Sequence, residues 1–108
     1  ELMDLSSRAR SKKLKPDEMK GGTFTLSSLG GIGGTGFSPI VNLPEVAIMG
    51  ISRSIWKQVF DKTSGEFVTR FAMPFSLSYD HRVIDGAAAA TFTSRFATVL
   101  TDISHFKD

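Results

Sequence analysis

The sequence contains no cysteine, which excludes a disulfide framework and any thiol chemistry from the protein's own side chains. Its net charge is only +2, which is too small to indicate a nucleic-acid partner. The apolar runs all fall far short of the roughly 18 residues that a membrane-spanning helix needs, so we expect no membrane association. The length of 108 residues allows one domain at most, with a modest hydrophobic core.

The N-terminal residues carry no visible targeting signal. The segment from Glu1 to Leu5 lacks both the basic residues and the apolar stretch of a secretory leader. The sequence also lacks an initiator methionine and starts within what resembles a helix. We therefore interpret the chain as a fragment or a processed piece of a longer protein.

The first twenty or so residues have helical patterns. Leu2, Leu5 and Ala9 share one face at helical spacing, which predicts a helix over residues 1–14. Basic side chains gather near its end, and we interpret them as a solvated face, with a phosphate-binding patch as the alternative. Pro16 ends this helix and suits the first turn of a short second one.

Extended segments follow. Residues 23–27 alternate polar and apolar side chains, which predicts a strand with Ser27 on the polar face, opposite Phe24 and Leu26. Residues 46–51 form a continuous apolar run, which is typical of a central strand buried on both faces.

The C-terminal half adds two strands and a helix. Residues 55–60 and 67–78 are predicted strands, joined by a hairpin turn at 63–65. Apolar residues at spacings of three and four then predict a helix over 86–103. The whole is a mixed α/β layer in which strands need helices for cover.

One motif match is rejected. Residues 31–36 fit G-x-G-x-x-G, the dinucleotide-binding fingerprint. That site requires a helix to open at the end of the motif, whose N-terminus holds the pyrophosphate. Here Pro39 pushes Ser38 away from helical geometry. The glycines instead indicate tight turns or a close approach of the backbone to a ligand.

The segment between the last strand and the last helix holds the chemically interesting residues. His81 and Asp85 lie four residues apart. On this spacing alone, Asp85 is best interpreted as the cap of the following helix and His81 as a surface histidine.

The wider sequence changes that interpretation. Residues 80–87 resemble the His-x-x-x-Asp-Gly signature of the 2-oxo acid dehydrogenase acyltransferases, which chloramphenicol acetyltransferase shares more loosely. Residues 21–30 resemble the active-site serine segment of that family, and residues 39–50 resemble its next characteristic stretch. The three segments occur in the family's order and spacing. The Asn-x-Pro-Glu-Val-Ala-Ile form of the third is similar to the bacterial acetyltransferases.

The resemblance implies a fold and a site. The fold is α/β, a chloramphenicol-acetyltransferase-like mixed sheet covered by helices, with residues 1–108 as the C-terminal half of the catalytic domain. The reaction is acyl transfer between dihydrolipoamide and coenzyme A. His81 would be the general base, Ser27 the donor to the oxyanion, and Asp85 an orienting group. Coenzyme A is then a substrate, a separate lipoyl domain carries the lipoyl-lysine, and no metal is needed.

The same resemblance implies partners. Family members are homo-oligomers, built from trimers in which neighbouring subunits share each site, and they bind lipoyl domains and other dehydrogenase-complex subunits. We expect a cytoplasmic protein if it is bacterial, or a mitochondrial matrix protein if it is eukaryotic. The last residues, 104–108, lack the aliphatic end typical of bacterial relatives, so the size of the assembly stays open. Two other functions remain: an inactive structural core fragment and a free-standing antibiotic acetyltransferase.

Overall fold

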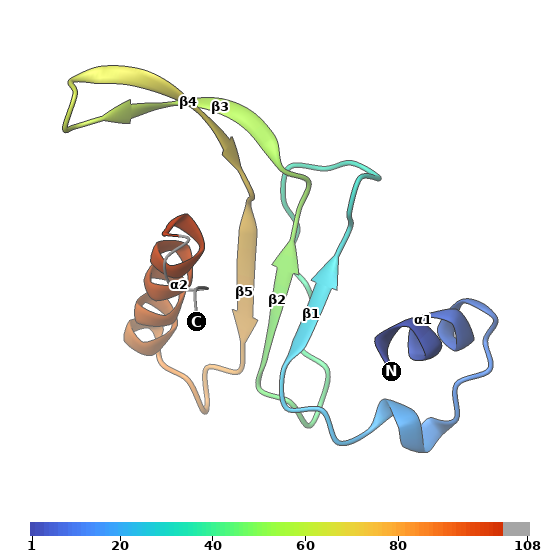
Figure 1. The fold of residues 1–108 in the computed structure, drawn as a ribbon. Coiled ribbons are helices and arrows are strands. Elements are labelled where there is room, and N and C mark those ends of the chain that lie inside the picture. The colour runs from blue at the N-terminus through green and yellow to red at the C-terminus, as the bar shows by residue number, and fades with distance from the viewer. Residues whose placement is uncertain (103–108) are drawn as a thin grey trace.

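A computed structural model describes residues 1–102 of the chain. In chain order the elements are α1 (Leu2–Arg10), the 3-10 helix η1 (Pro16–Met19), β1 (Thr25–Ser28), β2 (Ala47–Ile51), β3 (Ile55–Asp61), β4 (Glu66–Ala72), β5 (Phe75–Tyr79) and α2 (Gly86–Thr101) (Figure 1). The predicted mixed α/β architecture is confirmed. The predicted end of the last helix at Ile103 and the tail 104–108 lie outside the described residues.

β2 is the middle strand of a three-stranded sheet with the order β1-β2-β5. β1 runs parallel to β2, and β5 runs antiparallel to it. The first four residues of β2 are all buried, which confirms the prediction of a central strand from the apolar run. Because β1 and β5 pair only with β2, its burial holds the sheet together.

Helix α2 lies beside β5 and packs on one face of this sheet at that strand (Figure 1). On that face Met49 is in register with Leu77, and the ring of Phe75 lies 4.8 Å from the ring of Phe96 on the helix, edge to face. Ala89 is the one α2 residue that is fully buried in the described chain. Its small side chain lets the helix backbone approach the sheet closely.

The helix α1 is shorter than predicted. It ends at Arg10 and does not continue to residue 14. Lys12 adopts a φ of 59°, and the amides of Lys12 and Lys13 donate to the carbonyls of Ala9 and Arg8. This is the Schellman pattern that ends helices, here with lysine at the position where glycine is usual.

The single strand predicted over 67–78 is also wrong. β4 ends at Ala72 and β5 begins at Phe75, and the two belong to different sheets. Pro74 lies between them, and proline cannot donate to a strand ladder, so the chain bends there. The hairpin between β3 and β4 is confirmed, with Gly65 at φ 73° in its turn.

The β3–β4 hairpin projects as an arm away from the sheet (Figure 1). The radius of gyration is 17.0 Å, whereas a compact chain of this length would have about 13 Å. The accessible surface is 8735 Å², against about 5,900 Å² for a compact monomer of this mass. Large apolar side chains stay exposed on the arm: Trp56 70%, Phe67 69% and Phe71 60%. The chain therefore exposes an excess of surface on the scale of an obligate subunit interface.

Gly50 of β2 is required by close packing. A Cβ added there would lie 2.8 Å from Cζ of Phe37 and 3.0 Å from Oγ of Ser76. In the full-length protein, Gly50→Ala is expected to lower the free energy of unfolding by about 1–3 kcal/mol, the usual cost of overpacking.

Chemical denaturation measures this loss. The matched control is Gly31→Ala, because a Cβ at Gly31 meets no atom within 4 Å. Equal stability of the two variants would contradict the packing of Phe37 on β2.

Candidate functional site

The face of the sheet that is turned away from α2 carries Ser27. Leu26 of β1 is in register with Met49 on the α2 face, so Ser27 and Thr25 point the other way. The hydroxyl of Thr25 donates to Oε1 of Glu45 over 2.5 Å, in a partly buried contact. This bond fixes the segment that precedes β2 against the start of β1.

Ser27, Gly50 and Ser76 form one row across the three strands. Ser27 pairs with Gly50, and Gly50 pairs with Ser76, so their side-chain positions share one face. The ring of Phe37, from the segment after the glycine-rich loop, lies over Gly50. Oγ of Ser76 donates to the carbonyl oxygen of Phe37 over 2.6 Å. The close packing is thus at Gly50, whereas a Cβ at Gly31, Gly33 or Gly36 of the glycine-rich loop would meet no atom within 4 Å.

The histidine lies in a tight turn after β5. The amide of Asp80 donates to the carbonyl of Val46 over 2.8 Å, and the amide of Ile84 donates back to the carbonyl of Asp80 over 2.9 Å. His81 itself is exposed, with its ring 5.8 Å from the ring of Tyr79. The turn therefore presents the imidazole to solvent from a backbone that is fixed at both ends.

An ion pair braces this turn around His81. Oδ2 of Asp80 accepts from Nη2 of Arg82 over 2.8 Å, and Oδ1 accepts from Nε and from the backbone amide of Arg82, both over 3.0 Å. The side-chain bonds from Arg82, followed by its backbone amide, lower the pKa of Asp80 to about 2. The same pairing raises the pKa of Arg82.

Asp85 caps helix α2, as its position suggested. Its Oδ1 accepts from the amide of Ala88 over 2.7 Å. Within residues 1–102, no hydrogen bond or ion pair joins Asp85 to His81. The carboxylate thus serves the helix end in this chain, while the imidazole faces outward.

The structure does not bring Ser27 and His81 together in one chain. Ser27 shares its row with Ser76, whereas His81 follows Tyr79 at the far end of β5. The three residue steps from Ser76 to Tyr79 span about 10 Å along the strand, and His81 lies beyond that. A reaction that needs both side chains cannot occur between them within a single copy.

The comparisons with known proteins agree with the order of these segments. Residues 1–106 match the 2-oxoacid dehydrogenases acyltransferase (catalytic domain) family. The chain belongs to this family. It is 57% identical over 103 residues to the dihydrolipoyllysine-residue acetyltransferase component of the pyruvate dehydrogenase complex of Pseudomonas aeruginosa. The match covers 95% of this chain and 18% of that protein, so the chain spans less than a fifth of its relative.

Solved structures of acyltransferase cores share the fold. One is the Azotobacter vinelandii dihydrolipoamide acetyltransferase, studied for the role of a serine, a histidine and an asparagine in its catalytic mechanism. It is 57% identical with a TM-score of 0.88, over 94% of this chain and 41% of that one. Another is the cubic core of the pyruvate dehydrogenase multienzyme complex, 56% identical with a TM-score of 0.87 over the same shares.

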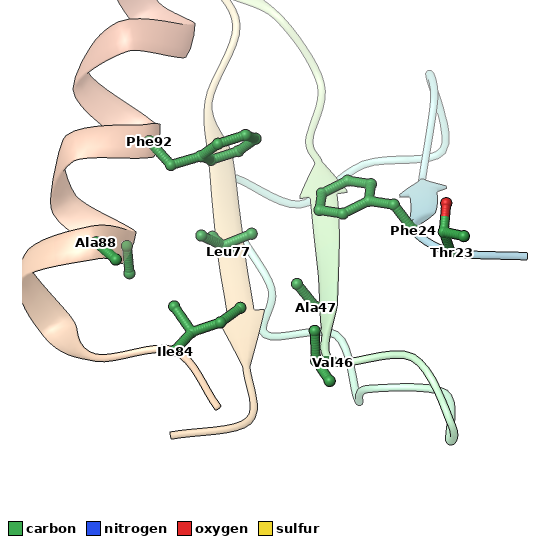
Figure 2. Close-up of a pocket in the computed structure, with 9 residues that line it drawn as sticks. Thr23, Phe24, Val46, Ala47, Leu77, Ile84, Ala88 and Phe92 are labelled. Carbon is green, nitrogen blue, oxygen red and sulfur yellow. The ribbon is translucent and has the colours of Figure 1, made fainter. Parts of the chain in front are cut away.

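One cavity of this acyltransferase chain lies between α2 and the sheet, on the face away from Ser27. It holds about 340 Å³ and is open and almost wholly apolar (Figure 2). Its walls are Thr23, Phe24, Val46, Ala47, Leu77, Ile84, Ala88, Ala89 and Phe92. Apart from the Thr23 hydroxyl these side chains carry no polar group, so the cavity has no group for acid–base chemistry.

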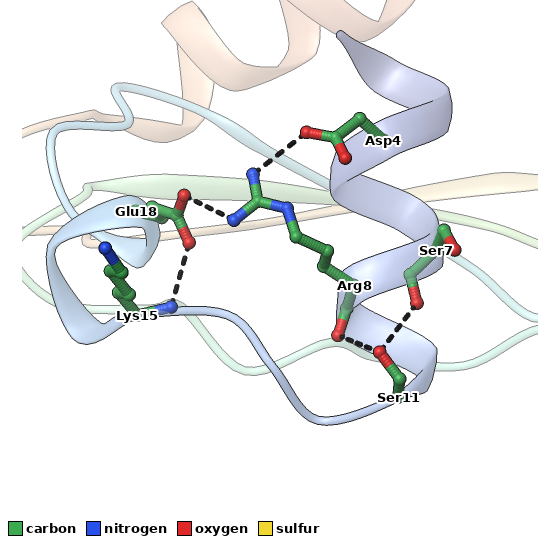
Figure 3. A network of polar contacts seen from close by, with 6 residues as sticks. All are labelled: Asp4, Ser7, Arg8, Ser11, Lys15 and Glu18. Carbon is green, nitrogen blue, oxygen red and sulfur yellow. Dashed lines mark hydrogen bonds and ion pairs between the residues drawn. The ribbon is translucent and has the colours of Figure 1, made fainter.

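Arg8, within the basic N-terminal segment of the acyltransferase chain, makes an ion-pair network (Figure 3). Its guanidinium contacts Glu18 over 2.6 Å and Asp4 over 3.1 Å. The Lys15 amide also donates to Glu18, over 2.8 Å, and this bond, followed by that from Arg8, lowers the pKa of Glu18. The network ties α1 to η1, so Arg8 is engaged within the chain.

Within residues 1–102 there is no group of three or more His, Cys, Asp or Glu side chains placed to hold a metal ion. No helix among those residues is both long and apolar enough to cross a bilayer.

Sequence reasoning missed several residues that support the candidate site. Asp80 and Arg82 flank His81 within the recognised signature, so their pairing could have been proposed from their spacing. The bond between Ser76 and Phe37 joins residues 39 positions apart, so no local sequence pattern predicts it. The Thr25–Glu45 bond is of the same long-range kind.

Because the Asp80–Arg82 ion pair lowers the pKa of Asp80, we expect its contribution to the free energy of unfolding to depend on pH. A carboxyl whose pKa is lowered from 3.8 to about 2 stabilises the folded state above pH 3.8 and loses that contribution as the pH falls through 2. In the full-length protein, Asp80→Asn should therefore be less stable than wild type at neutral pH. The difference should shrink across that acidic window.

Denaturation curves at several pH values test this prediction. Asp17→Asn is the control, because the Asp17 side chain makes no hydrogen bond or ion pair within the described chain. A wild-type advantage over Asp80→Asn that is constant with pH would contradict the role of the charge.

Proposed function

We propose that this chain is the C-terminal part of the catalytic domain of a dihydrolipoamide acetyltransferase, the core enzyme of a pyruvate dehydrogenase complex. One observation carries the proposal: 57% identity to such a component over almost the whole chain, including the turn that presents His81. Residues 1–108 correspond to the C-terminal half of the domain, in keeping with the 41% share of the solved cores.

The proposed reaction starts at His81. The thiol of coenzyme A is mostly protonated at neutral pH if its pKa resembles the value of about 8.5 for cysteine. An imidazole, with an ordinary pKa of about 6.5, can accept that proton near the working pH. The thiolate then attacks the carbonyl carbon of the acetyl thioester of lipoamide.

Ser27 acts on the tetrahedral intermediate. Its hydroxyl donates a hydrogen bond to the oxyanion, and one positioned donor is worth about 2.7–4 kcal/mol in the transition state. The intermediate collapses, expels the lipoyl thiolate, and that sulfur takes the proton from the imidazolium. No bond forms between the acetyl group and the protein, so Ser27 is not a nucleophile.

Asp85 supports this site from the start of α2. In the Azotobacter enzyme the histidine and asparagine under study are four positions apart, the spacing of His81 and Asp85 here. Asparagine and aspartate can both accept the capping bond from an amide such as that of Ala88. We therefore assign Asp85 the task of fixing the helix that follows the histidine turn.

The site is shared between subunits. Ser27 and His81 lie at opposite ends of the sheet in one chain, so a neighbouring copy must bring its histidine to this serine. The large exposed surface and the aromatic arm favour an obligate oligomer. In a closed ring of heterologous contacts, each copy receives a histidine from its neighbour and buries its exposed surface. We propose that this ring is a trimer and that a larger core is built from such trimers.

The remaining partners follow from the reaction. Coenzyme A and the lipoyl-lysine of a separate lipoyl domain are the substrates, and other subunits of the complex supply the acetyl group. No metal takes part in this chemistry. Because the relatives are bacterial, we propose a cytoplasmic location. A structural core fragment that assembles but is inactive without the missing N-terminal half is the alternative, and it predicts that residues 1–108 alone assemble without transferring acetyl groups.

Two substitutions in the full-length protein test the chemistry. His81→Ala should lower the rate of acetyl transfer by about 10²–10⁴-fold, the usual worth of a general base. Ser27→Ala should lower kcat by about 10²–10³-fold with a smaller effect on KM, because the bond strengthens in the transition state.

Steady-state transfer from acetyl coenzyme A to dihydrolipoamide measures both effects. Ser28→Ala is the matched control for Ser27→Ala, since Ser28 is the next residue of β1 and points to the opposite face. Near-normal turnover in His81→Ala would overturn the assignment of the base.

Mixing the two inactive proteins tests the shared site. In randomly mixed trimers, one boundary in four pairs an intact histidine with an intact serine, so about a quarter of the wild-type activity should return. A site contained in one chain would recover none. Subunit exchange is verified first by mass spectrometry of the mixed assemblies, so that a missing recovery counts against the shared site.

A further inference from the structure

Ser76 makes a contact that the proposed reaction does not use. Its hydroxyl donates to the carbonyl oxygen of Phe37 over 2.6 Å, in a partly buried position. The two residues are 39 positions apart, and the bond fastens the segment after the glycine-rich loop to β5. It is the only hydrogen bond of the Ser76 side chain in the described part of the chain, and its acceptor is the Phe37 backbone.

The contact lies next to Ser27. Gly50 separates Ser27 from Ser76 in their row, and the spot that a Gly50 Cβ would occupy is 2.8 Å from Cζ of Phe37 and 3.1 Å from its Cε1. Neighbouring strands are about 4.8 Å apart. The edge of the Phe37 ring therefore lies one strand away from the Ser27 side chain, on the same face.

We propose that Ser76 is a positioning residue for Ser27: its hydroxyl holds the Phe37 segment on the sheet, so that the ring walls the space beside the Ser27 hydroxyl. The proposal rests on the proposed role of Ser27 as the oxyanion donor.

The physical reason is that an apolar ring beside a hydrogen-bond donor keeps water away from that donor. A donor stabilises a developing negative charge more strongly where water is excluded and the local dielectric is low. The segment that Ser76 anchors follows a loop with glycines at 30, 31, 33, 34 and 36, which offers little stiffness of its own. Without the bond, the ring is free to leave Gly50 and water can reach Ser27.

Substitutions at Ser76 in the full-length, assembled protein test the proposal. Ser76→Ala removes the bond, and Ser76→Cys keeps the side-chain shape but offers only a weak donor. Both should lower kcat for acetyl transfer about five- to tenfold, with little change in KM. Ser78→Ala is the matched control, because Ser78 is on the same strand and face but makes no hydrogen bond to Phe37, both of which lie in the described part of the chain. Its activity should stay within about twofold of wild type.

A double-substitution cycle with Ser27 separates positioning from packing. If Ser76 acts through Ser27, then Ser76→Ala added to Ser27→Ala should cost less than about twofold. Equal losses in both backgrounds would overturn the proposal, as would a Ser76→Cys enzyme with full activity, because then only shape matters. Should Ser76→Ala melt below the assay temperature, the Ser76→Cys arm of the cycle decides.

The proposed role of Ser27 and the proposed role of Ser76 can be refuted separately. A fully active Ser27→Ala enzyme would refute the proposed function and remove the basis of the inference. An impaired Ser27→Ala enzyme with an additive Ser76 effect would refute the inference alone.

Discussion

The burial of β2 is the constraint on which the rest of the structure depends. Its apolar run leaves both faces to be covered and both edges to be paired, and β1 and β5 fill those edges in opposite directions. Ser27 near the end of β1 and His81 after the end of β5 are consequently carried to opposite ends of one sheet. On the proposed mechanism, these strand directions, more than any side-chain contact, keep a single copy from completing the site.

The two faces of the sheet differ in character: one is apolar and packs the fold, and the other carries the residues of the proposed chemistry. The α2 side is apolar, and its aromatic contacts and open cavity belong to packing. The other side has small polar residues, Ser27, Gly50 and Ser76, which let a loop segment lie on the strands. A larger side chain at Gly50 would overlap the Phe37 ring and Oγ of Ser76, and would push the ring away from the strands.

The sequence predicts the local features of this fold well. The apolar run of β2, the turn at Gly65 and the cap at Asp85 each depend on neighbours in the chain, and each is confirmed. The errors came from local signals that were overlooked: Pro74 within a supposed strand, and a Schellman end at Lys12. The bond between Ser76 and Phe37 is different in kind, since it depends on the register of strands, which no short segment specifies.

The large exposed surface shows how little of this chain segment is buried within itself. In residues 1–102, Ala47, Ile48, Met49 and Ala89 are the only fully buried apolar side chains, a core too small to stabilise a chain of this length. The β3–β4 arm has two aromatic pairs, a tilted pair of Trp56 with Phe71 and an edge-to-face pair of Phe60 with Phe67, and these side chains remain largely exposed. Ordering such side chains costs conformational entropy that only further burial can offset. The contacts that complete the core must therefore come from outside this chain segment, and on the proposed mechanism the same surroundings bring a histidine to Ser27.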